Sequence, residues 1–191
     1  MRFEKKQYKV ENLAEAWNSG SLARNEEYQR GEAWTLQQKQ ALVDSLLRDY
    51  PIPPLFLQMK TMAGLGGKTS DRWEIVDGQQ RILALRDFAG DKFPLLDPTD
   101  KRLKLPASMR KTSVPWANRT CSGLDAAIRS KFAGTLIDVY EISHVSSPDE
   151  VRDLFIRLQS GTALTRQQIR DAWPGNLGVC PSNSFSQARE V

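Results

Sequence analysis

The feature that most constrains the fold is a strand that runs directly into a helix between residues 72 and 90. Alternating aromatic and β-branched residues over 72–76 predict the strand. Ile82, Leu85 and Phe88 share one face of the predicted helix, and Gly90 follows its last turn. The pentapeptide Asp77-Gly78-Gln79-Gln80-Arg81 therefore forms a corner between two regular elements.

The residues of this corner suit either an anion site or a plain helix start. Asp77 followed by Gln80 three residues later fits a capping box. Gly78 and Arg81 bring free backbone N–H groups, the positive end of the helix dipole and a guanidinium together, which suits a phosphate. The alternative is a capped corner with a surface arginine, and local physics favours the two interpretations equally.

Around the corner, apolar patterns and capping signals predict further helices and strands. A capping box at Thr35 and Gln38 begins a helix that must end before Pro51. Ser147 with Glu150 marks the clearest helix start of the chain. We also expect helices over 12–17, 122–132 and 165–173, strands over 7–10, 55–59 and 136–142, a hairpin loop over 61–71 and basic loops between 90 and 120.

Composition excludes several classes of protein. A chain of 191 residues predicts one domain, or one domain with an appendage. No stretch approaches the roughly 20 apolar residues of a membrane span, and the start lacks the apolar segment of a secretory signal. Cys121 and Cys180 have no metal-ligand spacing. We therefore expect a cytoplasmic protein with no membrane partner.

The only histidine, His144, limits the chemistry further. One histidine cannot build an HNH nuclease centre or a HExxH metal site, and no G-x-S-x-G motif supplies a nucleophile for a triad. His144 lies between a predicted strand and a predicted helix start. We expect it to be structural or solvated.

Positive charge is concentrated in one segment. The net charge is +4, yet the segment from Lys101 to Arg119 carries six basic residues and no acidic residue. Such a segment can attract nucleic acid, although a solvated basic loop is the commoner explanation. The DNA-binding alternative uses Arg102, Lys104, Arg110 and Lys111, with Trp116 as a stacking residue.

Several strings together resemble one known family. They are Tyr28-Gln29-Arg30 with Trp34, the segment 46–53, the segment 76–81, and the segment 154–161 with Leu164-Thr165. Their order and spacing resemble the N-terminal domain of GmrSD-type restriction proteins, within the ParB/sulfiredoxin-like superfamily. The resemblance covers about residues 8–173, so we expect a domain over 1–173. The aperiodic residues 174–191 are expected to form a flexible, truncated tail.

The resemblance implies an α/β domain, with a small mixed sheet flanked by helices, that binds nucleoside triphosphates and in some members hydrolyses them. The resemblance implies catalytic roles for Asp77, Gln79 and Arg81. The phosphate-binding residues carried over are Gln29, Arg30, Gly78, Gln80, Arg81 and Arg157. The role of Asp77 stays open between a helix cap, a general base and a ligand of Mg²⁺.

The resemblance also implies partners. In larger relatives the domain is coupled to an HNH-type nuclease domain that acts on modified phage DNA, and ParB-like relatives often pair as homodimers. Gln159 stands where many members have asparagine. The leading hypothesis is a nucleotide-binding regulatory domain of a phage-defence protein, with weak NTPase activity left open. The alternatives are a DNA-binding module, a histidine-independent ParB-like nuclease and an inactive remnant.

Overall fold

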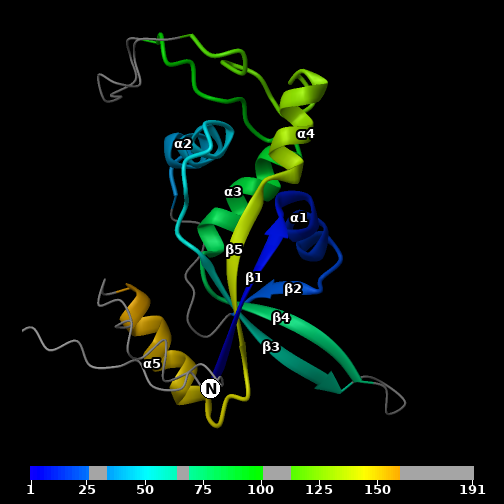
Figure 1. Ribbon diagram of the computed structural model, residues 1–191, viewed down its shortest axis with the longest axis vertical. Coiled ribbons are helices and arrows are strands. Elements are labelled where there is room, and N and C mark those ends of the chain that lie inside the picture. The colour runs from blue at the N-terminus through cyan, green and yellow to red at the C-terminus, as the bar shows by residue number, and fades with distance from the viewer. Residues whose placement is uncertain (26–33, 64–68, 101–112, 160–191) are drawn as a thin grey trace, which may run out of the picture.

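The computed structural model describes residues 1–25, 34–63, 69–100 and 113–159. Strands and helices follow one another in mixed order along the chain. The strands form one sheet, which has helices on both sides (Figure 1). In chain order these are β1 (Arg2–Lys9), α1 (Val10–Asn18), β2 (Leu22–Arg24), α2 (Leu36–Leu47), β3 (Leu55–Ala63), β4 (Thr69–Asp77), α3 (Gln79–Ala89), α4 (Ala126–Gly134), β5 (Leu136–Ser143) and α5 (Pro148–Gln159).

The sheet has the strand order β1-β5-β3-β4-β2. The pairs β1–β5 and β3–β4 are antiparallel, whereas β3–β5 and β2–β4 are parallel. The sheet is therefore mixed, and the predicted α/β architecture is confirmed.

Local sequence explains where several of these elements begin. At α2 the Thr35 hydroxyl accepts the Gln38 N–H at 3.4 Å, and the Gln38 side chain accepts the Thr35 N–H at 2.8 Å, so the predicted capping box forms. The β3–β4 hairpin is also confirmed, but its strands are longer than predicted. A hydrogen bond of 2.9 Å from the Thr61 hydroxyl to Asp71 lies within the pairing that was expected to be a loop.

Four details differ from the prediction. The first strand begins at Arg2, not at Gln7, because the three successive charged residues Glu4-Lys5-Lys6 hide its two-residue period. Val10 opens α1 instead of ending that strand, and the three-residue strand β2 was not predicted at all. Asp125 is the N-cap residue of α4, but its side chain makes no capping hydrogen bond.

The main hydrophobic core lies between one face of the sheet and helices α1 to α4. Phe88 is fully buried at its centre, with its ring 5.6 Å from Phe93 and 5.0 Å from Phe132. Leu57 and Ile75 supply the sheet side of this core. Burial of such side chains is the main stabilising term of a domain of this size.

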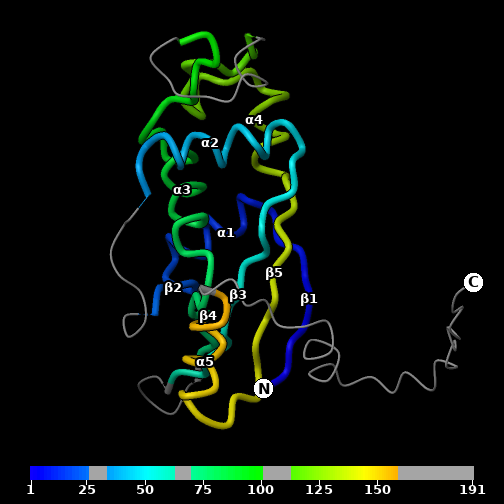
Figure 2. The backbone as a smooth tube through the Cα atoms, turned by 90° about the vertical axis from the view of Figure 1, so that its left-hand side faces the viewer, coloured from blue at the N-terminus to red at the C-terminus, as the bar shows by residue number. Residues whose placement is uncertain are grey.

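A second, smaller core lies on the opposite face of the sheet, where α5 packs. Val151 and Leu154 of α5 contact Val76 of β4 and Ile142 of β5. Figure 2 shows α5 beside the end of β4 that leads into α3. Because Val76 directly precedes Asp77, α5 is packed against the strand that carries the corner.

The single histidine and one of the two cysteines lie within the described residues. His144 is exposed, and its Nδ1 lies 3.1 Å from the Ser143 hydroxyl, as expected for a solvated histidine. Cys121 is a buried free thiol, and burial raises its pKa.

The predicted helix over 165–173 and the tail 174–191 lie outside the described residues. Among the described helices, none combines the length and the apolar character needed to cross a membrane.

Candidate functional site

The corner between β4 and α3 is built around Gly78. Its backbone is left-handed, with φ of 99° and ψ of 12°. A β-carbon at this position would lie 2.3 Å from Leu55 Cδ2 and 3.0 Å from Arg81 Nη2. Only glycine combines this backbone with so close an approach to β3 and to the arginine.

The predicted capping box at this corner does not form. Gly78 is the N-cap residue of α3 and supplies no side-chain hydrogen bond to the first turn, while Asp77 still belongs to β4. The Asp77 carboxylate instead accepts a hydrogen bond from Arg81 Nη2 at 2.6 Å. The positive end of α3 therefore carries no cap from its own N-cap residue, as an anion site at a helix N-terminus requires.

Arg81 is held in place across the corner. Its Nη2 also donates to the Pro54 carbonyl oxygen at 3.2 Å, and its side chain is only 14% exposed. Its Nε is buried and has no hydrogen-bond partner. The guanidinium is thus fixed by two contacts and keeps a donor unused.

Gln79, the first residue of α3, is the most unusual polar group of the corner. The residue is only 5% exposed, and neither its Nε2 nor its Oε1 has a hydrogen-bond partner. A buried amide without partners costs about 1–3 kcal/mol relative to a satisfied one. Such a group calls for an explanation, and a ligand that completes its hydrogen bonds is one.

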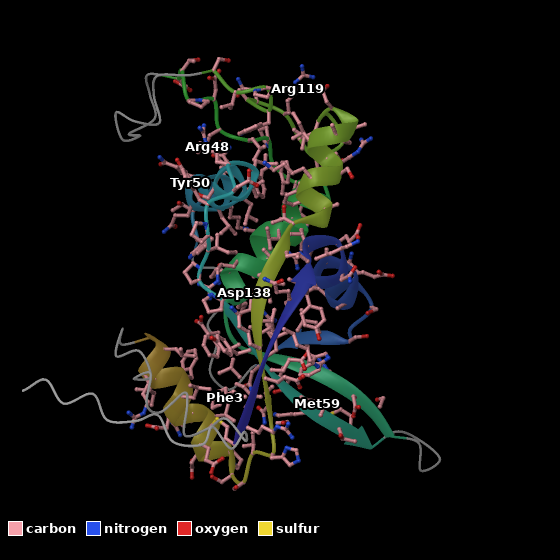
Figure 3. All side chains as sticks on the ribbon, viewed as in Figure 1. Phe3, Arg48, Tyr50, Met59, Arg119 and Asp138 are labelled. Carbon is pink, nitrogen blue, oxygen red and sulfur yellow. The ribbon has the colours of Figure 1, made fainter. Side chains whose placement is uncertain are left out.

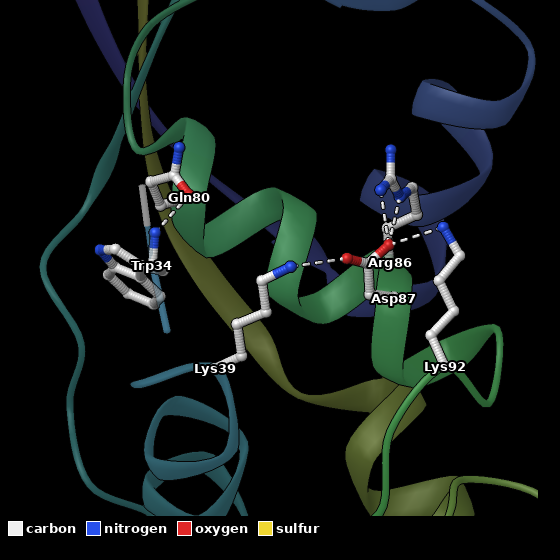
Figure 4. A network of polar contacts seen from close by, with 6 residues as sticks. All are labelled: Trp34, Lys39, Gln80, Arg86, Asp87 and Lys92. Atoms are coloured by element: carbon white, nitrogen blue, oxygen red, sulfur yellow. Dashed lines mark hydrogen bonds and ion pairs between the residues drawn. The ribbon is translucent and has the colours of Figure 1, made fainter. Parts of the chain in front are cut away.

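The segment that contains Gln29 and Arg30 lies outside the described residues, but both of its flanks are attached near the corner. The Asn25 side chain donates to Glu74 of β4 at 2.9 Å. After the segment, the Trp34 N–H donates to Gln80 Oε1 at 3.4 Å (Figure 4). The described residues on either side of this segment, Asn25 and Trp34, are therefore bonded to β4 and to the first turn of α3.

Arg157 lies on the exposed side of α5. Its Nε donates to the Asp153 carboxylate one turn earlier at 2.7 Å. The same helix packs through Leu154 onto Val76, beside the corner. The structure therefore brings Asp77, Gly78, Gln79, Gln80 and Arg81 together and puts Arg157 on the neighbouring helix; its participation stays a prediction.

Most of the predicted DNA-binding set cannot be placed. Arg102, Lys104, Arg110 and Lys111 lie outside the described residues.

Trp116 is described, and it is tied to α2. Its indole Nε1–H donates to Asp44 at 2.8 Å. The Arg48 guanidinium, at the end of α2 (Figure 3), lies over the Trp116 ring at 5.7 Å and also donates to Asp44 at 2.7 Å. These contacts give the indole a packing role, and stacking on DNA stays a prediction.

A buried ionic cluster surrounds Asp87 of α3, the helix that begins at the corner, and it was not predicted from the sequence. Asp87, near the end of α3, is only 4% exposed and accepts from Lys39 at 3.0 Å, from Arg86 Nε at 2.9 Å and from Lys92 at 2.9 Å (Figure 4). Burial raises the pKa of Asp87, but the three cationic donors outweigh it and lower the pKa to about 2. An acidic residue next to Phe88 on the apolar side of the helix was the available signal.

A metal site made by the protein alone is absent from the described part of the chain, where no three His, Cys, Asp or Glu side chains gather. At the corner, Asp77 is the carboxylate that could meet a cation, and its Oδ2 is paired with Arg81. Mg²⁺ at this position fits only if phosphate oxygens and water complete its shell, as is usual for this ion.

Comparison with known proteins identifies one family. The family described as "GmrSD restriction endonuclease, N-terminal domain" matches residues 10–173. No curated protein matches the chain. The matched region contains the corner, both anchored flanks and α5.

Proposed function

The chain belongs to the family of GmrSD restriction endonuclease N-terminal domains, and from this premise we propose that it is the nucleotide-binding regulatory domain of a restriction-like protein. In this proposal the phosphates of a nucleoside triphosphate bind at the corner formed by residues 77–81. The observation that carries it is the buried, unpartnered amide of Gln79 at an uncapped helix N-terminus. The ParB/sulfiredoxin-like relationship is part of the same proposal.

Each residue of the corner has a physical role in such a site. The first N–H groups of α3 and the helix dipole attract phosphate oxygens. Gly78 adopts the left-handed turn and leaves room for the Arg81 guanidinium, which a β-carbon would crowd. Arg81 supplies charge-assisted hydrogen bonds, and Asp77 orients its guanidinium.

We also propose that the same corner hydrolyses the bound NTP weakly. Phosphoryl transfer depends mainly on positioning and on the stabilisation of negative charge, which Arg81 and the helix N-terminus would provide. Asp77 would orient the attacking water or share a Mg²⁺ with the phosphates. A separate nuclease domain of the restriction-like protein would be the partner that responds to the bound nucleotide.

Replacement of Arg81 by alanine tests the proposal. We expect the affinity for an NTP with Mg²⁺ to fall at least about tenfold, because a charge-assisted hydrogen bond contributes roughly 1.5–3 kcal/mol. Isothermal titration calorimetry measures the affinity, and circular dichroism verifies that the variant is folded.

The matched control is Arg129→Ala. Arg129 is exposed on α4, away from the corner, and its Nη1 donates a hydrogen bond to the Ser122 carbonyl oxygen at 3.3 Å. This variant should bind the nucleotide as the wild type does. Equal binding by wild type and Arg81→Ala would overturn the proposed function.

A further inference from the structure

Two aromatic residues continue the corner across the sheet. In the strand register Asp77 of β4 lies opposite Phe56 of β3, and Phe56 lies opposite Tyr140 of β5. Neighbouring strands are about 4.8 Å apart. Phe56 is therefore one strand away from Asp77, and Tyr140 is two strands away.

The two rings form a stacked pair. Their centroids are 5.1 Å apart and their planes differ by 20°. Both residues are half-buried, so part of each ring remains accessible. Cross-strand aromatic pairs stabilise sheets, and partly exposed aromatic rings are also what proteins use to stack nucleobases.

The arginine of the corner is linked to the strand that carries the first ring. Arg81 Nη2 donates to the Pro54 carbonyl oxygen, two residues before Phe56. On one side Phe56 borders the small core made by α5 and Val76, and on the other it meets Tyr140. The ring pair therefore lies one and two strands from Asp77, about 5 to 10 Å along the sheet, on the face where α5 packs.

We propose that the base of the bound nucleotide packs against the Phe56–Tyr140 pair while its phosphates occupy the corner. This inference rests on the proposed function and adds a second recognition element to the same site. Stacking gives the site a preference for a nucleotide over a bare phosphate chain, since only the nucleotide has a ring to place on the pair.

The test compares an NTP with inorganic tripolyphosphate, both with Mg²⁺, by calorimetric titration of the full chain. Wild-type protein should bind the NTP more tightly than tripolyphosphate. Tyr140→Leu should weaken NTP binding about tenfold, as for the loss of one base–aromatic stack, and leave tripolyphosphate binding unchanged. Tyr140→Ile serves as a second variant with a strand-favouring side chain.

Two controls separate the ring from other properties of the residue. Tyr140→Phe keeps the ring and should keep the NTP affinity. Tyr50→Leu removes an exposed tyrosine that lies next to α2, away from the Phe56–Tyr140 pair (Figure 3), and it should also have no effect.

The outcomes distinguish this inference from the function on which it rests. If wild type binds NTP and tripolyphosphate equally, or if both leucine and isoleucine variants keep the NTP affinity, the base does not use the ring pair and the phosphate site stands. If wild type binds neither ligand, the proposed function fails and the inference falls with it.

Discussion

Replacing Gly78 by alanine is expected to lower the free energy of unfolding by about 3 kcal/mol. Two costs combine: a left-handed backbone at φ of 99° and a β-carbon placed 2.3 Å from Leu55 Cδ2. Relief of this clash must displace the Leu55 side chain or the corner itself, and Leu55 is fully buried in the main core, so its displacement disturbs that packing. Urea denaturation followed by circular dichroism measures the change.

Gly20→Ala is the matched control for this prediction. Gly20 also has a positive φ, of 78°, but a β-carbon there would meet nothing within 4 Å. The control should therefore show the backbone cost alone, about 1 kcal/mol. Equal losses in the two variants would contradict the close packing described at the corner.

Asp87→Asn is expected to cost about 3 kcal/mol of unfolding free energy, since it removes the buried negative charge that Lys39, Arg86 and Lys92 share. Lys39 is almost as buried as Asp87, with a side chain 11% exposed against 6%. The control is Asp153→Asn, which removes an exposed i,i+4 pair with Arg157 and should change stability little. Chemical denaturation at neutral pH compares the three proteins.

The same residue gives a dependence on pH. The native pKa of Asp87, about 2, is below its unfolded value near 3.8, so the carboxylate stabilises the fold above about pH 4. This contribution is lost as the pH falls from about 4 to about 2. Asp87→Asn should therefore lose less stability over that interval than wild type, and parallel pH profiles would contradict the assignment.

Sequence alone predicted the elements that are defined by short-range signals. The capping box at Thr35, the β3–β4 hairpin and the helix stop at Gly90 depend on neighbouring residues, and all three are confirmed. The strand β2 was missed because three residues, Leu22–Arg24, are too few to show a period. Its place is set by parallel pairing with β4, which is a tertiary interaction.

At the candidate site, sequence correctly placed residues 77–81 at a corner between a strand and a helix, but it predicted an incorrect local contact. Asp77 is the last residue of β4 and pairs with Phe56, beside a shift in register, while Gly78 takes the N-cap position of α3. The Asp77 carboxylate accepts from Arg81 instead of capping the helix. Burial of the Gln79 amide depends on how α3 seats on the sheet, and no local pattern reports it. The Asp87 cluster likewise joins residues that are up to 48 positions apart.

The measurement that tests the central claim most directly is nucleotide binding by Gln79→Leu. If the Gln79 amide is buried without partners because a ligand completes it, leucine should raise the stability of the free protein by about 1 kcal/mol. The same change should weaken NTP binding at least about tenfold in a calorimetric titration. A variant that binds the nucleotide as tightly as wild type would contradict the assignment of this corner as the nucleotide site.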